Sequence, residues 1–380
     1  MRGTNTRKTQ ASDPGPSSGI LPPPPTFWRR LRYLGPGLII TASIVGSGEL
    51  IMTTKLGAEA GFTLLWLVIL GCVVKVFVQV ELGRYVMSSG ETALEAMNRV
   101  PGPRVVVSWL LWIWLAMFFS LFFQVSGIAG TLAAIFTSHL DEDASRGWSV
   151  FWIIAITLTV IGLLVWGRYR LVERFSTAMV FFFTFTTILA VCLLQWTDYA
   201  LRAEEIWHGL SFRITRPDGE LVNFTTAFAA FGITGVGASE LIYYPYWCLE
   251  KGYARVVGPR EESVEWEERA KGWIRVLRTD AFLSLIVYTV ATVAFYLLGA
   301  AVLPTALAGH SLSDVSGTEL VRTLATMYEN TFGDWGFFLF LVGAFFVLYS
   351  TYFVATASNA RVLTDALGLF RVLRYDHPGS

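Results

Sequence analysis

The sequence predicts an all-α polytopic membrane protein whose two halves contain related, oppositely directed segments. Its composition is the first observation, because 54% of the 380 residues are hydrophobic and 15% are charged, against roughly 25% charged residues in a typical soluble domain. The second is a short phrase that occurs twice, as VGSGELI at residues 45–51 and as VGASELI at residues 236–242. Each copy lies in an apolar segment long enough to cross a bilayer, so two spans carry a carboxylate beside small residues.

Eight segments have the length and composition of a membrane-spanning helix, which needs about 20 mostly apolar residues. The first and sixth carry the repeated phrase. Because glycine in a helix interior costs up to about 1 kcal/mol relative to alanine, we expect both to break there. The third is too long for one straight span, so we expect it to tilt or to extend into a loop. The predicted spans are 34–56, 62–83, 105–137, 149–166, 175–196, 224–248, 280–303 and 335–359.

The positive charges between the spans predict the orientation. With a cytoplasmic N-terminus, 22 of the 29 Lys and Arg residues lie in cytoplasmic segments, six lie in outer loops, and Lys75 lies within the second span. Cytoplasmic loops carry such an excess of positive charge, so we expect this orientation, in the plasma (inner) membrane. Residues 258–278 are charged and amphipathic, and we expect a short surface helix in a cytoplasmic loop. Five spans precede the second phrase, so the two copies run in opposite directions, which is an inverted repeat.

The predicted organisation has five parts. Residues 1–33 are rich in Pro, Ser, Thr and Gly and lack the apolar region of a signal peptide, which predicts a disordered cytoplasmic tail. Residues 34–200 form the first repeat (spans 1–5), 201–223 an extracellular loop, 224–370 an incomplete second repeat (spans 6–8), and 371–380 a cytoplasmic tail. The net charge of zero argues against nucleic-acid partners. No motif predicts a cofactor, a catalytic centre or an oligomeric state, so we expect a protein that is not an enzyme.

The candidate binding site lies at the two breaks. Backbone groups that a broken span frees are tolerated only when they are buried in protein or line a wet cavity. Two carboxylates, freed carbonyls and hydroxyls form an all-oxygen set, which suits hard cations such as Mg²⁺, Ca²⁺ or Mn²⁺, or coupled Na⁺ or H⁺. Alternatively, both carboxylates lie at an interface or form structural pairs. The candidate substrate-binding or ion-binding residues are Glu49, Glu240, Gly46, Ser47, Gly48, Gly237 and Ser239, with Glu49 and Glu240 as metal ligands.

Two further polar residues within the spans are candidates for coupling or for counter-charge. Lys75 is flanked by apolar residues, and an ammonium within a membrane needs a partner. It is either a counter-charge to the two carboxylates that occupies a cation site in one state, or a member of a fixed structural salt bridge, for which Glu81 near the end of the same span is a candidate partner. Gln124, in the third span, either faces a cavity or forms a hydrogen bond between helices.

Several stretches resemble the Nramp family, the natural resistance-associated macrophage protein group of proton-coupled divalent-metal transporters. They are Gly35-Pro36-Gly37 before the first break, GFTLLW at residues 61–66 and GITG at residues 232–235. The similarity covers residues 34–100 and 224–250. It implies a leucine-transporter-type fold with two inverted five-helix repeats, and hence a chain that lacks the last two spans.

The binding motifs of that family are altered in this sequence. Its first-span break reads Asp-Pro-Gly-Asn, and the Asp and Asn bind metal, whereas this chain has GSGE at residues 46–49. The Met-Pro-His motif of its sixth span is absent, and Ser239 and Glu240 fall about where the Met and Pro would be. The acidic residues of its third span are absent too, with Gln124 nearby. The resemblance therefore implies the same scaffold with different binding chemistry.

Three functions follow as hypotheses. The leading one is a secondary transporter that moves a divalent cation (Mg²⁺, Ca²⁺ or Mn²⁺) held at the broken spans and coupled to H⁺ or Na⁺. The second is a transporter of an amino acid or other small organic substrate, in which Lys75 mimics a cation. The third is a non-transporting membrane binding protein, which the missing spans favour and the two repeated carboxylates disfavour. The expected partners are the lipid bilayer and an inorganic cation or small molecule.

Overall fold

The computed structural model describes residues 19–46, 48–137, 142–167, 169–216, 219–307 and 317–373. This part of the chain is helical apart from an isolated bridge between Thr215 and Leu221 and one antiparallel ribbon of two short strands. The strands are β1 (Arg104–Val105) and β2 (Val107–Ser108). The prediction of an all-α fold is confirmed.

Long apolar helices account for six of the eight predicted spans. Within the described residues these six helices are apolar enough to cross a membrane, and a pair of shorter helices bent by 46° adds a seventh span, the predicted first one. The predicted sixth span is formed by two shorter helices separated by residues 234–237. The six long helices are α4 (Leu65–Ser89), α6 (Trp109–Thr137), α7 (Glu142–Trp166), α8 (Tyr169–Leu194), α13 (Val264–Leu307) and α15 (Asp334–Leu369).

The two broken spans are built from short helices. The first comprises α2 (Pro36–Ile44), the π-helical segment η2 (Gly48–Thr53) and α3 (Thr54–Ala60). The other comprises α10 (Phe224–Ile233) and α11 (Ala238–Lys251). Helices at the ends of the molecule and between the spans are α1 (Phe27–Arg30), η1 (Leu31–Tyr33), α5 (Ala93–Asn98), α9 (Ala203–Gly209), α12 (Tyr253–Val257) and α14 (Gly317–Phe332).

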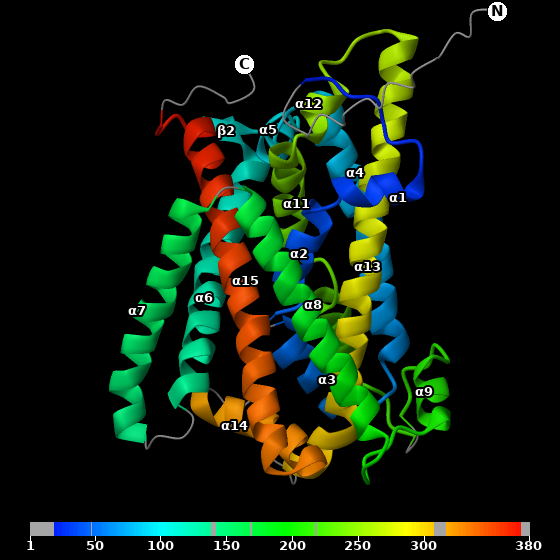
Figure 1. Ribbon diagram of the computed structural model, residues 1–380, viewed down its shortest axis with the longest axis vertical. Coiled ribbons are helices and arrows are strands. Elements are labelled where there is room, and N and C mark those ends of the chain that lie inside the picture. Colours follow the sequence, from blue (N-terminus) through cyan, green and yellow to red (C-terminus); the bar gives the residue numbers. More distant parts are fainter. Residues whose placement is uncertain are drawn as a thin grey trace, which may run out of the picture.

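The broken spans run through the bundle in opposite directions. In Figure 1, α5 and α12 lie at one end of the molecule, and α9 and α14 lie at the other. The chain runs from α2 to α3 away from the α12 end, whereas α11 runs back toward it. The structure thus shows the antiparallel relation that the repeated phrase predicts.

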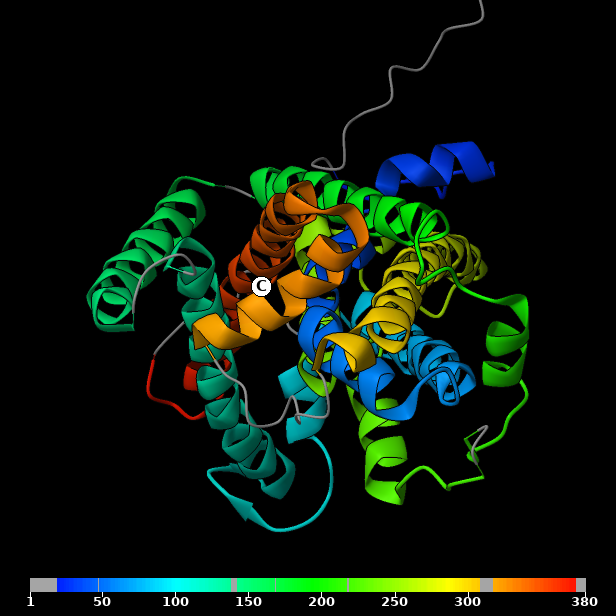
Figure 2. The ribbon, with the colours of Figure 1, turned by 90° about the horizontal axis from the view of Figure 1, so that it is seen from below.

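Burial separates the centre of the bundle from its edge. In the apolar stretches of α13 and α15, 56% of the residues are buried, against 11% in α7. Helix α13 packs along α2, α3 and α4, and α15 packs along α2, α6 and α8. Figures 1 and 2 both place α7 at the edge, beside α6. The two central helices therefore face the first broken span from two sides.

Three expectations need correction. Residues 19–33 of the predicted disordered tail have a defined structure, which includes the helices α1 and η1. Leu21 holds this segment against the bundle: its carbonyl accepts the indole N–H of Trp273, and its N–H donates to the carbonyl of Val256. Residues 1–18 lie outside the described part. The predicted third span begins with the β1–β2 ribbon, and its helix starts at Trp109. The charged segment 258–278 is no separate surface helix, since most of it continues into the seventh span as the start of α13.

Candidate functional site

A cavity of about 480 Å³ lies between the two breaks, α6 and α15. The repeated phrases line it from opposite halves of the chain, and α6 contributes Gln124 and apolar side chains. Of the predicted site residues, those at the cavity wall are Gly48, Glu49, Gln124, Gly237, Ser239 and Glu240. Ser47 lies outside the described residues, Gly46 packs behind the wall, and Lys75 approaches from the side of α4.

Glu49 is the more deeply buried of the two carboxylates, with 1% of its surface exposed. It lies in the first turn of η2, where the helix resumes after the break. The hydroxyl of Thr292 on α13 donates to Oε1 at 3.4 Å. Helix α10 of the other broken span packs against η2, so Glu49 lies where the two broken spans meet.

Glu240 lies in the first turn of α11, where the positive end of the helix dipole stabilises a negative charge. Two hydroxyls donate to its carboxylate. Ser43, in the last turn of α2, donates to Oε1 at 3.0 Å, and Ser239 donates to Oε2 at 2.8 Å. The first of these bonds joins α2 of span one to α11 of span six.

The two carboxylates interact with one another, and the interaction is repulsive when both are ionised. Repulsion between like charges is strong where little water screens it. A cation placed in the cavity would offset this repulsion. The site is therefore suited electrostatically to a positively charged occupant.

Both breaks depend on a glycine. A Cβ atom at Gly46 would lie 1.8 Å from the Thr351 hydroxyl of α15, so no side chain fits there. Gly235 has a φ of +72°, which favours glycine, and a Cβ atom there would lie 2.9 Å from the backbone of Cys72 on α4. These close approaches hold the first break against α15 and the second against α4.

Lys75 does not pair with Glu81, which forms an ion pair with Arg84 at 2.7 Å. Its ammonium instead donates to the carbonyl oxygens of Gly232 at 3.0 Å and Thr234 at 2.6 Å. It also lies 5.6 Å from the centre of the Phe231 ring. The structural alternative that names Glu81 is thus wrong, and the partner of Lys75 is the break in span six.

The site also contains residues that the sequence prediction missed. Ser43 precedes the first phrase by less than one helical turn, so its helical position could have revealed it. Thr292 and Thr351 belong to α13 and α15, and no pattern in those spans distinguishes them from other threonines. Their role depends on which helix faces the break, which only the packing reveals.

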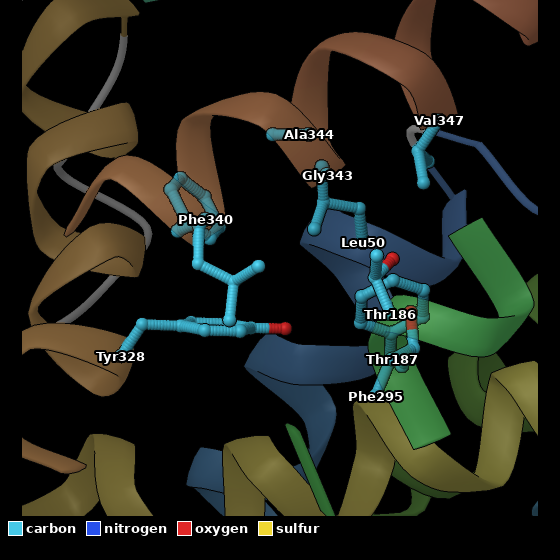
Figure 3. A pocket seen from close by; sticks show the side chains of 10 residues that line it. Leu50, Thr186, Thr187, Phe295, Tyr328, Phe340, Gly343, Ala344 and Val347 are labelled. Carbon is cyan, nitrogen blue, oxygen red and sulfur yellow. The ribbon is translucent and has the colours of Figure 1, made fainter. Parts of the chain in front are cut away.

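Side chains from four helices pack against η2 on the α14 side. A void of about 10 Å³, room for roughly one water molecule, lies between Leu50 of η2 and residues of α8, α13, α14 and α15. Figure 3 shows these side chains converging from the different helices. The rings of Tyr328 and Phe340 lie 5.3 Å apart in its wall. Leu50, which follows Glu49 in η2, is thus packed among side chains of these helices.

On the opposite side, polar contacts tie α11 to α15. Trp247 donates to the hydroxyl of Ser358 at 3.0 Å, and Tyr243, whose side chain lines the cavity, donates to Asn359. Further along the helices, Arg361 donates to the Glu250 carboxylate at 2.9 Å. These contacts fix the direction of α11, and with it the position of Glu240 at its first turn.

The donor set limits the chemistry. Within the described residues, His, Cys, Asp and Glu form no group of three or more that could hold a metal ion. The cavity is lined by the two glutamates, by Ser43 and Ser239, and by glycines of both breaks. Such a site binds a hard cation only if water completes the coordination.

Comparisons with known proteins agree with this geometry. The model of the family described as natural resistance-associated macrophage protein-like (Nramp) matches residues 37–374. An uncharacterized protein of Pasteurella multocida is 23% identical over 364 residues, which cover 90% of this chain and 72% of that protein. A protein of Bradyrhizobium diazoefficiens named divalent metal cation transporter MntH is 24% identical over 257 residues, covering 66% of this chain and 53% of its own length.

Solved structures show the same fold. A crystal structure of the Eremococcus coleocola manganese transporter, in complex with an aromatic bis-isothiourea substituted compound, superposes with a TM-score of 0.66 at 15% sequence identity. The superposition covers 95% of this chain and 70% of that one. The predicted leucine-transporter-type architecture is therefore confirmed.

Proposed function

Because this chain belongs to the Nramp family, we propose that it is a secondary transporter that moves a divalent metal cation across a membrane. The cation occupies the cavity between the two breaks. The observation that carries this proposal is the convergence of Glu49 and Glu240, which come from opposite halves of a multi-pass membrane protein and line one cavity. Charged groups within a membrane are costly, and such carboxylates mark substrate or ion pathways.

The chemistry of the cavity favours a hard cation that keeps part of its water shell. The two carboxylates supply charge, and the cavity of about 480 Å³ has room for the water molecules that complete the coordination. Mg²⁺ binds through one or two carboxylates and retains several waters, while Ca²⁺ and Mn²⁺ also accept oxygen ligands. The substrate is accordingly one of Mg²⁺, Ca²⁺ and Mn²⁺.

Transport is coupled to H⁺ or Na⁺ in this proposal. When the divalent cation leaves, Glu49 and Glu240 face one another across the cavity, and a proton or a sodium ion would offset their repulsion. The coupling ion thus uses the same carboxylates as the substrate.

Calorimetry with purified protein in detergent tests the binding site. We expect saturable binding of at least one of Mg²⁺, Ca²⁺ and Mn²⁺ by the wild type, and a loss of affinity of about 30-fold or more in Glu49→Gln and in Glu240→Gln. The control is Glu59→Gln, whose exposed carboxylate pairs with Lys55 in α3 at 3.6 Å. Folded wild-type protein that binds none of these ions, or that binds them equally well in both variants, would contradict the proposal.

A second function, transport of a small organic substrate, is favoured by the size and lining of the cavity. Its volume falls within the roughly 300–1,000 Å³ of small-molecule sites, and Met52, Met117, Leu121 and Tyr243 contribute apolar surface. In that case one carboxylate serves as a proton carrier. The same calorimetry with amino acids distinguishes the two, because saturable amino-acid binding without any divalent binding supports only the second function.

A further inference from the structure

The break in span six holds a positive charge that belongs to the protein itself. Lys75 projects from α4 to the end of α10, and its Nζ lies 3.0 Å from the carbonyl oxygen of Gly232 and 2.6 Å from that of Thr234. The face of the Phe231 ring lies 5.6 Å away, at a distance where an aromatic ring attracts a cation. Two oxygens and a ring thus surround the ammonium.

These oxygens are freed by the break. Helix α10 ends at Ile233, so its last carbonyls have no partners within the helix, and they carry the negative end of the helix dipole. Carbonyl oxygens at such a helix end attract cations, and in a membrane they need a partner or water. An ammonium and a monovalent metal ion are alternative partners for the same oxygens.

The location links this charge to the proposed binding site. Gly232 and Gly235 line the cavity, and the Lys75 ammonium interacts electrostatically with the carboxylates of Glu49 and Glu240. Among the described residues Lys75 forms no ion pair, whereas the other cation of α4, the half-exposed Arg84, pairs with Glu81. The charge of Lys75 is therefore directed at the break and the cavity.

We propose that the break in span six is a monovalent-cation site that Lys75 fills with its own ammonium, and that this fixed charge sets the affinity of the cavity for divalent cations. The second part rests on the proposed function. A positive charge beside the two carboxylates weakens the attraction for a divalent ion and prevents tight, slowly released binding. It also removes the need for a second bound cation at this end of α10.

Three variants test whether Lys75 acts through its charge on the cavity or only by capping the end of α10. Lys75→Met removes the charge and both hydrogen bonds, and Lys75→Gln removes the charge while its amide can still donate to a carbonyl. Lys55→Met is the control, because Lys55 lies in α3 and pairs with exposed Glu59. Each is prepared as the full chain in detergent, and divalent binding is measured by calorimetry.

We expect Lys75→Met and Lys75→Gln to bind the divalent cation about tenfold more tightly than the wild type, with no change in Lys55→Met. A helix cap alone predicts a different pattern, in which Lys75→Gln behaves as the wild type and Lys75→Met unfolds at lower temperature with unchanged affinity. That pattern would overturn the proposal.

A readout independent of divalent binding tests the site itself. We expect Na⁺ or K⁺ to raise the unfolding temperature of Lys75→Met saturably at constant ionic strength (choline as the replacement), and to have no such effect on the wild type or on Lys55→Met. If Na⁺ or K⁺ stabilises Lys75→Met but the wild type binds no divalent cation, the monovalent site is supported and the proposed function is contradicted. The absence of any specific Na⁺ or K⁺ effect on folded Lys75→Met would overturn the site.

Discussion

At the scale of single residues, the contact between Gly46 and α15 decides where the first span breaks. A Cβ atom at this position would lie 1.8 Å from the Thr351 hydroxyl and 2.7 Å from its Cβ. Thr351 is itself held by a hydrogen bond from its hydroxyl to the carbonyl of Ala42 in α2, at 3.1 Å. The break and α15 therefore cannot separate without losing packing on both sides.

Gly46→Ala should destabilise the protein by about 1–3 kcal/mol, because the added methyl group overpacks a rigid contact. We expect a lower midpoint of thermal unfolding in detergent and weaker divalent binding, since the backbone near Glu49 must move. The control is Gly48→Ala, where an added Cβ meets no atom within 4 Å. Equal unfolding midpoints for the two variants would contradict this account of the break.

The residues of the candidate site were predictable to different degrees. Glu49 and Glu240 were predicted because each is a charge in a repeated apolar phrase, and the structure places both at the cavity wall. Lys75 was singled out because it is a charge within an apolar span. Its carbonyl partners could not be predicted, because they belong to a distant segment of the sequence. Thr292 and Thr351 are ordinary threonines in apolar helices, so only the packing of α13 and α15 against the break identifies them.

At the scale of elements, the N-terminal end of α2 is fixed by a residue from another span. The buried Asp280 of α13 accepts the backbone N–H groups of Gly35 at 2.9 Å and Gly37 at 2.6 Å, and the hydroxyl of Tyr244 donates to it at 3.2 Å. These N–H groups have no partner within α2, because the first turn of a helix leaves its donors free. Asp280 thus anchors the half-helix that carries Ser43 toward the cavity.

Asp280→Ala should remove these bonds and leave two buried N–H groups unpaired, which costs about 2–4 kcal/mol. We expect a marked fall in the unfolding midpoint of Asp280→Ala, and a smaller fall in Asp280→Asn, which retains one carbonyl oxygen as an acceptor. The exposed Asp198 provides the control, as Asp198→Ala. An Asp280→Ala variant as stable as this control would show that α2 is anchored by its apolar packing alone.

The elements were predicted best where composition alone defines them. All eight predicted spans correspond to helices or broken helix pairs, because a run of about 20 apolar residues has few other solutions. Boundaries were less predictable at charged ends. Helix α13 has 44 residues, far more than a bilayer requires, because its charged N-terminal turns continue the helix beyond the apolar stretch. A hydrophobicity threshold does not detect helical turns that are charged.

At the scale of the whole molecule, the inverted arrangement explains why the site lies where it does. Two broken spans of opposite direction meet at the centre of the bundle, with α13 and α15 packed beside the first break. The positions of α5 and α12 at one end and α9 and α14 at the other match the alternation of loops on which the predicted orientation rests. The repeat was visible in the sequence, whereas the cavity between its copies depends on the packing of all the spans.

The chain also differs in length from the proteins that it resembles. It covers 70% of the Eremococcus coleocola manganese transporter and 53% of the Bradyrhizobium diazoefficiens MntH. In the proposed function, binding at Glu49 and Glu240 requires only the breaks and the helices around them. Transport requires in addition that the cavity open alternately to the two sides, which is a property of the whole bundle.

Uptake into proteoliposomes tests the central claim most directly, with the purified 380-residue chain reconstituted and Mg²⁺, Ca²⁺ or Mn²⁺ followed by a trapped fluorescent indicator. We predict uptake of at least one of these ions down its gradient by the wild type, none above empty vesicles by Glu49→Gln or Glu240→Gln, and normal uptake by Glu59→Gln. Uptake equal to that of empty vesicles for all three ions with folded wild-type protein, or undiminished uptake by both glutamine variants, would contradict the account.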